Sequence, residues 1–109
     1  MSSSGDLATA LAALDRRARS YTVTAWRARG RADIAFALAG RLVDLARAAG
    51  DPVPALTPTP VVAEHAIADV LTVLGADLVA ALAARPDPTL EADAAAAVNA
   101  ALDTLDAVG

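Results

Sequence analysis

The stretch DIAFALAGRLVDLARAAGDPVPALTPTP, residues 33–60, contains an amphipathic segment followed by an abrupt stop. Apolar residues recur there at intervals of three and four, the spacing of one helix face: Ile34, Leu38, Leu42, Leu45 and Ala49. Asp33 is a suitable N-cap, and Gly50 is a typical residue to end a helix. Four prolines in the next ten residues exclude both helix and strand. The stretch therefore predicts a helix over 33–49 and a proline-rich linker over 51–58.

The same periodicity predicts three further helices, over about 6–29, 59–84 and 88–107. Each has one apolar face, made by Leu7, Leu11, Leu14 and Ala18, by Ile67, Leu71, Leu74, Leu78 and Leu82, and by Leu90, Ala94, Val98, Ala101 and Leu105. Asp87 and Pro88 have the residue types of an N-cap and a first helical position. Four amphipathic helices predict an all-α fold, an antiparallel four-helix bundle made by a single domain spanning 1–109.

The helix over 6–29 contains one segment that favours a break, SYTVT at residues 20–24. Its β-branched and hydroxyl side chains are poor helix formers, and Ser20 or Thr24 could cap a new start. The heptad phase nevertheless passes through Tyr21 undisturbed. We therefore expect a continuous helix, with a break between Ser20 and Thr24 as the alternative.

The helix over 33–49 has an unusually wide apolar sector. Phe36 and Val43 widen it to about 200°, well beyond the stripe of a one-sided surface helix. This width predicts either the central helix of the bundle or one side of an oligomer contact.

The composition excludes several chemistries. The 109 residues include 31 alanines, no cysteine and no lysine, and 56% of them are hydrophobic. Thiolate catalysis, zinc–thiolate sites and Schiff bases are therefore excluded, and no glycine-rich nucleotide-binding motif is present. Two glutamates and one histidine are too few for the di-iron site of helical bundles. We expect no cofactor and no metal site, and the chain favours a non-enzymatic role.

The start of the chain has no signal-like segment, and no uncharged apolar run approaches the roughly 20 residues that cross a bilayer. We therefore expect a cytoplasmic protein that makes no membrane contact. The use of arginine alone as the basic residue, together with the alanine content, is typical of a GC-rich bacterial gene.

Charge is unevenly distributed along the chain. Residues 1–50 carry eight arginines and four aspartates, +4, whereas residues 51–109 carry one arginine and nine carboxylates, −8. Six arginines lie within residues 16–31, beside the only tyrosine and tryptophan. Because halves of opposite sign attract, these arginines have carboxylate partners available within the fold or across an oligomer.

In a continuous first helix, Val23 and Trp26 would face away from its core stripe and lie among arginines. Such a tryptophan is typical of an interface hot spot, so we expect Val23, Trp26, Phe36 and Val43 to form an interface with a second copy or another protein. The alternative is that Trp26 caps the end of the bundle, with the arginines solvated or paired with aspartates of neighbouring helices. Arg16, Arg19 and Arg27 could instead bind a nucleic acid or a phosphorylated ligand, as backbone-binding arginines do. The net charge of −4 and the absence of lysine disfavour nucleic acid.

A third possibility is a small-molecule site between the alanine-lined helices, reaching His65. His65 and Asp69 are four residues apart, close enough on a helix for a hydrogen bond or ion pair. The helical wheel places both opposite the apolar face, which is typical of a solvated pair. The sequence therefore favours a small, self-associating helical interaction or scaffold module, with anion binding and small-molecule binding as alternatives.

Overall fold

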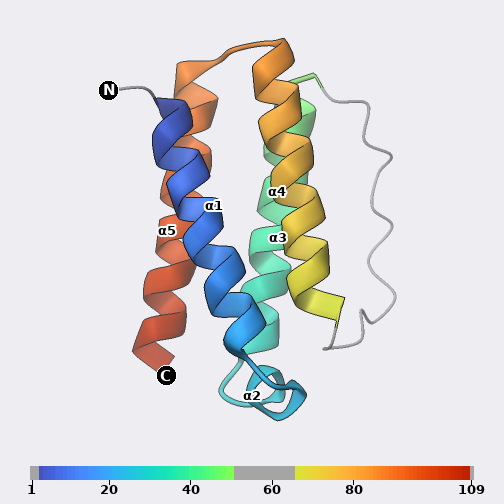
Figure 1. Ribbon diagram of the computed structural model, residues 1–109, viewed down its shortest axis with the longest axis vertical. Helices are drawn as coiled ribbons and strands as arrows, with labels where there is room; N and C mark the ends of the chain where they lie inside the picture. The colour runs from blue at the N-terminus through green and yellow to red at the C-terminus, as the bar shows by residue number, and fades with distance from the viewer. Residues whose placement is uncertain (1–2, 51–65, 109) are drawn as a thin grey trace.

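A computed structural model of the chain describes residues 3–50 and 66–108, and these two stretches contain helices and turns but no strand. The helices are α1 (Ser3–Ser20), α2 (Val23–Arg27), α3 (Arg31–Ala48), α4 (Ile67–Ala84) and α5 (Pro88–Val108). The four long helices lie side by side as a bundle, and the short α2 lies below one end of it (Figure 1). The predicted all-α fold is confirmed.

The directions of the helices differ from a fully antiparallel arrangement. Figure 1 shows α1 and α5 running one way and α3 and α4 the other. Side-chain contacts agree: Arg17, near the end of α1, pairs with Asp106, near the end of α5. The neighbouring pairs α1–α5 and α3–α4 are thus parallel, and the fully antiparallel topology is not confirmed. Parallel neighbours need a long connection between them, and α3 ends at the opposite end of the bundle from the start of α4 (Figure 1).

The core lies between the four long helices and is built mainly from leucine, valine and alanine. Leu42, Leu78 and Val98 are completely buried, one each from α3, α4 and α5. Alanines fill many of the other core positions, including Ala10, Ala18, Ala35, Ala46 and Ala94. Short side chains allow the helices to approach closely, so many of the chain's alanines serve to pack the helices together.

The predicted continuous helix over 6–29 is wrong, because the chain breaks at Tyr21 and Thr22. Thr22 has extended backbone angles (φ −76°, ψ 167°), and its side chain accepts a hydrogen bond from the backbone N–H of Ala25 at 3.1 Å. Ser20 donates its hydroxyl to the carbonyl of Arg17 at 2.6 Å. The hydroxyl residues thus satisfy backbone groups at the end of one helix and the start of the next, which makes the break favourable.

The turn into α3 is left-handed. Arg29 and Gly30 both have positive φ, 57° and 72°, and Gly30 is the N-cap residue of α3. The expected N-cap, Asp33, is instead in the first turn of α3, where a carboxylate still interacts favourably with the helix dipole. At the other end of α3, Gly50 has φ 94° and donates its N–H to the carbonyl of Arg47 at 2.9 Å.

A short turn joins α4 to α5. The Asp87 carboxylate accepts hydrogen bonds from the backbone N–H groups of Thr89 and Leu90, both at 3.1 Å, so Asp87 caps α5 as its residue type predicts. The predicted linker over 51–58 and the first part of the predicted helix over 59–84 lie outside the described residues.

Candidate functional site: the groove between α1 and α4

Trp26 does not have the exposed position expected of it. The helix break turns α2 back onto α3, and Trp26 is only 2% exposed. Its ring lies 4.9 Å from that of Tyr21 in an edge-to-face arrangement with an interplanar angle of 70°. Val23, by contrast, is 38% exposed. The expectation that both residues face away from the core is therefore wrong for Trp26, which is a core residue.

The wide apolar sector of α3 is used inside the bundle. Val43 is 4% exposed, and Phe36 is partly buried against the core. Because α3 contacts α2, α4 and α5, its neighbours cover several sides of it. Of the two interpretations of the wide sector, the structure favours the central helix. Because Trp26 and Val43 are buried, the four residues do not form the shared surface that we expected of them.

The six arginines within residues 16–31 are called the strip below, and several of them have partners within the described chain. Arg17 pairs with Asp106. Arg29 donates to the carbonyl of Val108 at 2.9 Å. Arg31 donates to the carbonyl of Ala25 at 2.9 Å and lies over the Tyr21 ring at 5.3 Å. The strip is thus divided among separate contacts at the lower end of the bundle.

The three arginines considered for anion binding lie on two different helices. Arg16 and Arg19 are exposed on α1, and Arg27 is exposed on α2. Arg19 forms ion pairs with Asp15 at 2.9 Å and with Asp69 at 3.1 Å. An incoming anion would therefore meet two carboxylates at Arg19.

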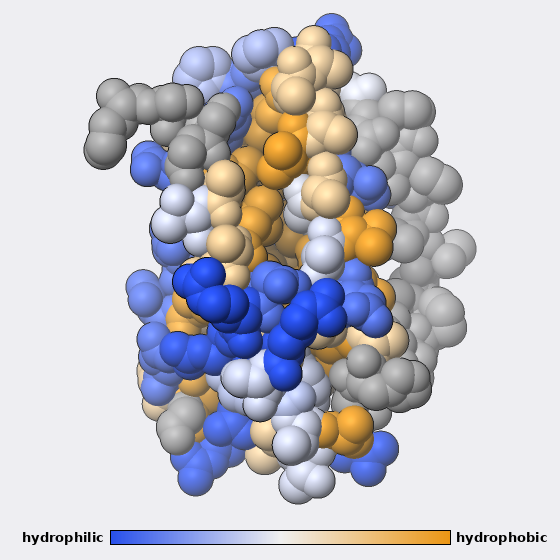
Figure 2. Space-filling view, viewed as in Figure 1, coloured by the Kyte–Doolittle hydropathy of each residue, from blue (hydrophilic) through white to orange (hydrophobic). Residues whose placement is uncertain are grey.

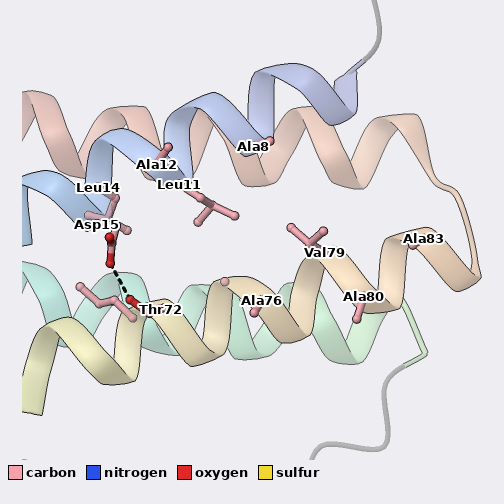
Figure 3. Close-up of a pocket in the computed structure, with 12 residues that line it drawn as sticks. Ala8, Leu11, Ala12, Leu14, Asp15, Thr72, Ala76, Val79, Ala80 and Ala83 are labelled. Atoms are coloured by element: carbon pink, nitrogen blue, oxygen red, sulfur yellow. Dashed lines mark hydrogen bonds between the residues drawn. The ribbon is translucent and has the colours of Figure 1, made fainter.

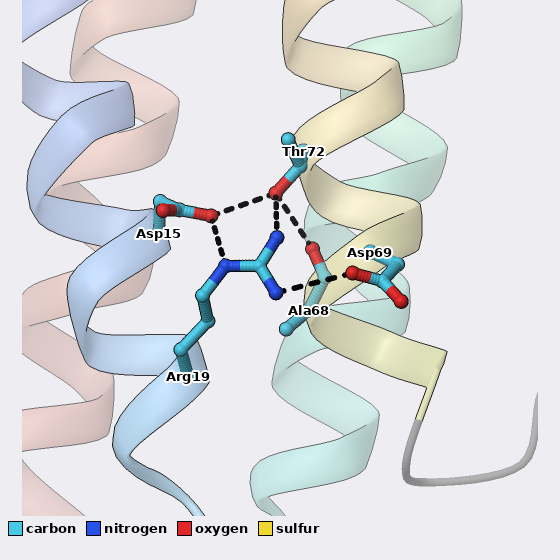
Figure 4. A network of polar contacts seen from close by, with 5 residues as sticks. All are labelled: Asp15, Arg19, Ala68, Asp69 and Thr72. Carbon is cyan, nitrogen blue, oxygen red and sulfur yellow. Dashed lines mark hydrogen bonds and ion pairs between the residues drawn. The ribbon is translucent and has the colours of Figure 1, made fainter.

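Arg19 is the centre of a polar network that joins α1 to α4 (Figure 4). Its Nη2 donates to Thr72 Oγ1 at 3.2 Å. The same hydroxyl lies 2.7 Å from Asp15 Oδ1 and 2.9 Å from the carbonyl of Ala68, both of which can accept its proton. The pKa of Asp15 lies below its ordinary value, chiefly because Thr72 donates to the carboxylate and further because Arg19 hydrogen-bonds to it.

Beside this network, an apolar groove opens between α1 and α4. It has a volume of about 460 Å³. Its lining is almost entirely apolar and includes Ala8, Leu11 and Ala12 from α1 and Ala76, Val79, Ala80 and Ala83 from α4. Figure 3 shows Leu11 and Val79 facing one another across the space, with Asp15 and Thr72 at one end. In Figure 2 the groove is a hydrophobic band that is crossed, toward α2, by hydrophilic residues.

The groove exists because short side chains face each other where two helices are loosely packed. The pair α1–α4 is in less extensive contact than the pairs α1–α5, α3–α4 and α3–α5. Leu11 approaches α4 closely at Gly75, where an added Cβ would lie 2.9 Å from Leu11 Cδ2. Alanines on either side cannot reach across the gap, so the space between the helices stays open.

Within residues 3–50 and 66–108, the apolar face of α4 next to the groove is left uncovered. Val73 is 57% exposed and Val79 is 42% exposed. By length and composition α4 could cross a membrane, a property shared by core helices of soluble proteins, but only 39% of its residues are buried. The most apolar helix of the bundle is therefore incompletely covered.

Of the His65–Asp69 pair, His65 lies outside the described residues, and Asp69 pairs with Arg19. Among residues 3–50 and 66–108, no group of three acidic or histidine side chains is placed to hold a metal ion.

The sequence suggested a site between the alanine-lined helices but did not predict that the groove lies between α1 and α4. The wall on α4 has a sequence signal, because Ala76, Ala80 and Ala83 repeat at helical spacing opposite the inward leucines. The other wall comes from α1, whose lining residues are more than 50 positions away in the chain, so the pairing of the two helices had to be known. The fold and this groove define a helical bundle with an open apolar surface. Comparison with protein-family models, curated proteins and solved structures found no match.

Proposed function

We propose that the protein is a non-enzymatic helical interaction module that self-associates, and that the α1–α4 face is its interaction surface. The observation that carries this proposal is the uncovered apolar face of α4, with Val73 and Val79 exposed beside an open groove. Exposed apolar surface of this kind is typical of protein interaction sites. The cytoplasmic location, bacterial origin and homodimeric state inferred from the sequence are part of the same proposal.

The charges around this face support an interface. Its centre has an apolar lining, and the charged residues Asp15, Arg19 and Asp69 lie at one end. Protein interfaces have this organisation, with few charges in the core and a polar rim. The proposed surface replaces the one expected around Trp26 and Val43, since those two side chains are buried.

Anion binding by Arg16, Arg19 and Arg27 is a weaker alternative. The ion pairs of Arg19 with two aspartates support a structural role for that residue. Small-molecule binding in the groove is also weaker, because the polar groups nearest to its apolar wall already bond to one another.

Sedimentation equilibrium from low to high micromolar concentration tests the proposal. We expect a concentration-dependent dimer, which Ala80→Glu weakens by at least about tenfold, because an unpaired charge buried at an interface costs more than about 1.4 kcal/mol. Ala37→Glu is the matched control, because Ala37 is exposed on α3 and does not line the groove. A wild-type protein that stays monomeric throughout, or equal effects of both substitutions, would refute the proposal.

A further inference from the structure

Helix α4 has two apolar faces, and the part of the chain that the structure describes buries only one of them. The inward face contains the buried Ile67, Leu71, Leu78 and Leu82. The outward face contains Val73, Ala76, Ala80 and Ala83, all exposed and spaced three, four and three residues apart. This heptad spacing is the one by which two helices pack along a shared seam.

The outward face has both a protrusion and a recess. Val73 is the most exposed large apolar side chain of the described residues, and it does not line the groove of its own chain. Ala76, Ala80 and Ala83 do line that groove, where they leave space unfilled. A second α4 can therefore place its valine against these alanines while it offers its own alanines in return, as an interface with two-fold symmetry requires.

The charges at the two ends of α4 favour one orientation. Asp69, which pairs with Arg19 of its own chain, remains exposed near the start of α4, and Arg85 is exposed just after its end. Asp77 lies to one side of the outward face, in a hollow that it shares with Ala49 and Gly50 from the end of α3. Antiparallel pairing brings Asp69 toward Arg85 of the partner subunit and also opposes the two helix dipoles. Parallel pairing would bring the two end charges, Asp69 and Arg85, each toward its own copy, which is unfavourable.

We propose that a second copy of this chain covers the outward face of α4, with the two α4 helices antiparallel about a two-fold axis midway between Ala76 and Ala80. In this arrangement Val73 lies against Ala83 of the partner subunit, at the end of the groove away from the Arg19 network. The inference rests on the proposed self-association and adds the orientation and register of the pair.

Cysteine cross-linking can separate the two orientations, because the chain contains no native cysteine. Positions 73 and 83 are ten residues apart, or about 15 Å along a helix. A disulfide needs Cα atoms within about 4.4–6.8 Å. In the antiparallel pair, position 73 is close to the partner's position 83 but about 15 Å along the helix axis from its own copy. In a parallel pair the reverse holds.

The experiment compares Val73→Cys, Ala83→Cys and the double variant after mild oxidation, at a concentration where sedimentation finds the dimer. We expect a covalent dimer in most of the double variant and in an equimolar mixture of the two single variants, and at least about tenfold less in either single variant alone. Ala37→Cys on α3 is the control for random collision, and circular dichroism checks that each variant is folded.

The outcomes separate the inference from the proposed function. A sedimenting dimer in which the single variants cross-link as well as the double variant overturns the antiparallel arrangement while self-association stands. A dimer in which no variant cross-links above the Ala37→Cys level assigns the contact to another surface and also overturns the inference. A monomer at every concentration refutes both. Co-sedimentation of that monomer with phosphatidylcholine vesicles would identify a lipid surface as the occupant.

Discussion

Helices α3 and α4 have the same length, 18 residues each, but differ in how much of their apolar surface the bundle covers. The wide apolar sector of α3, including Val43, is largely buried. The more apolar α4 leaves Val73 and Val79 exposed. The difference follows from their neighbours, because α3 contacts α2, α4 and α5, whereas α4 contacts α3 closely and α1 only loosely.

This comparison shows that apolar width alone does not identify an interaction surface. A helix with three neighbours buries a wide sector, and a helix with one close neighbour exposes even a narrow second stripe. We therefore infer that α4, and not α3, has the unused surface of this fold. The predictions that follow test each side of the contrast.

The largest effect is expected at the start of α3, where α2 packs against it. Trp26→Ala should lower the free energy of unfolding by about 3–5 kcal/mol, because it removes a buried aromatic side chain and leaves a cavity. Urea denaturation followed by circular dichroism measures this loss. Val23→Ala, at an exposed position of the same helix, should change stability by less than about 0.5 kcal/mol. A Trp26→Ala variant that is as stable as the wild type but no longer dimerises would contradict this prediction and show that Trp26 is an interface residue.

A second pair of substitutions compares α3 and α4 directly. Leu42→Ala on α3 should cost about 2–5 kcal/mol, because Leu42 is completely buried. Val73→Ala on α4 should cost less than about 0.5 kcal/mol when measured at a concentration too low for association, since Val73 is 57% exposed. Thermal and urea denaturation at low micromolar concentration measure both values. Equal costs would mean that α4 is covered within a single chain and would remove the contrast.

The helical periodicity of the sequence was sufficient to identify the inward residues of each long helix, such as Leu42 and Leu78. The end signals at Gly50 and Asp87 were also sufficient, because they act within a few residues. The break before α2 was harder to predict, since the heptad phase continues through Tyr21 whether or not the chain turns there. The burial of Trp26 depends on that turn. Whether the chain breaks at Tyr21 and Thr22 therefore decides how the whole strip is interpreted.

Predicting the groove required information that no single segment of the sequence contains. Ala8 and Ala12 are ordinary exposed residues of an amphipathic helix until Ala76 and Ala80 of another helix are placed opposite them. The parallel directions of α1 and α5 could not be predicted for a similar reason. The spacing of apolar residues is the same whichever way a helix runs in the bundle. Topology therefore determined the candidate site, and topology depends on contacts between distant parts of the chain.

The smallest effect is expected at the rim of the groove, where Asp15 connects α1 to α4. Because the pKa of Asp15 lies below its ordinary value of 3.8 in the folded protein, its contacts stabilise the fold above that pH and stop doing so as the pH falls. The stability difference between wild type and Asp15→Asn should thus be largest near neutral pH and shrink below about pH 4. Urea denaturation at a series of pH values measures it, with Asp93→Asn on α5 as the control for a general loss of charge. A difference that stays constant down to the acid range would show that the network contributes only through hydrogen bonds that the amide also makes, and α4 would then be held against α1 by Leu11 and Gly75 rather than by charge.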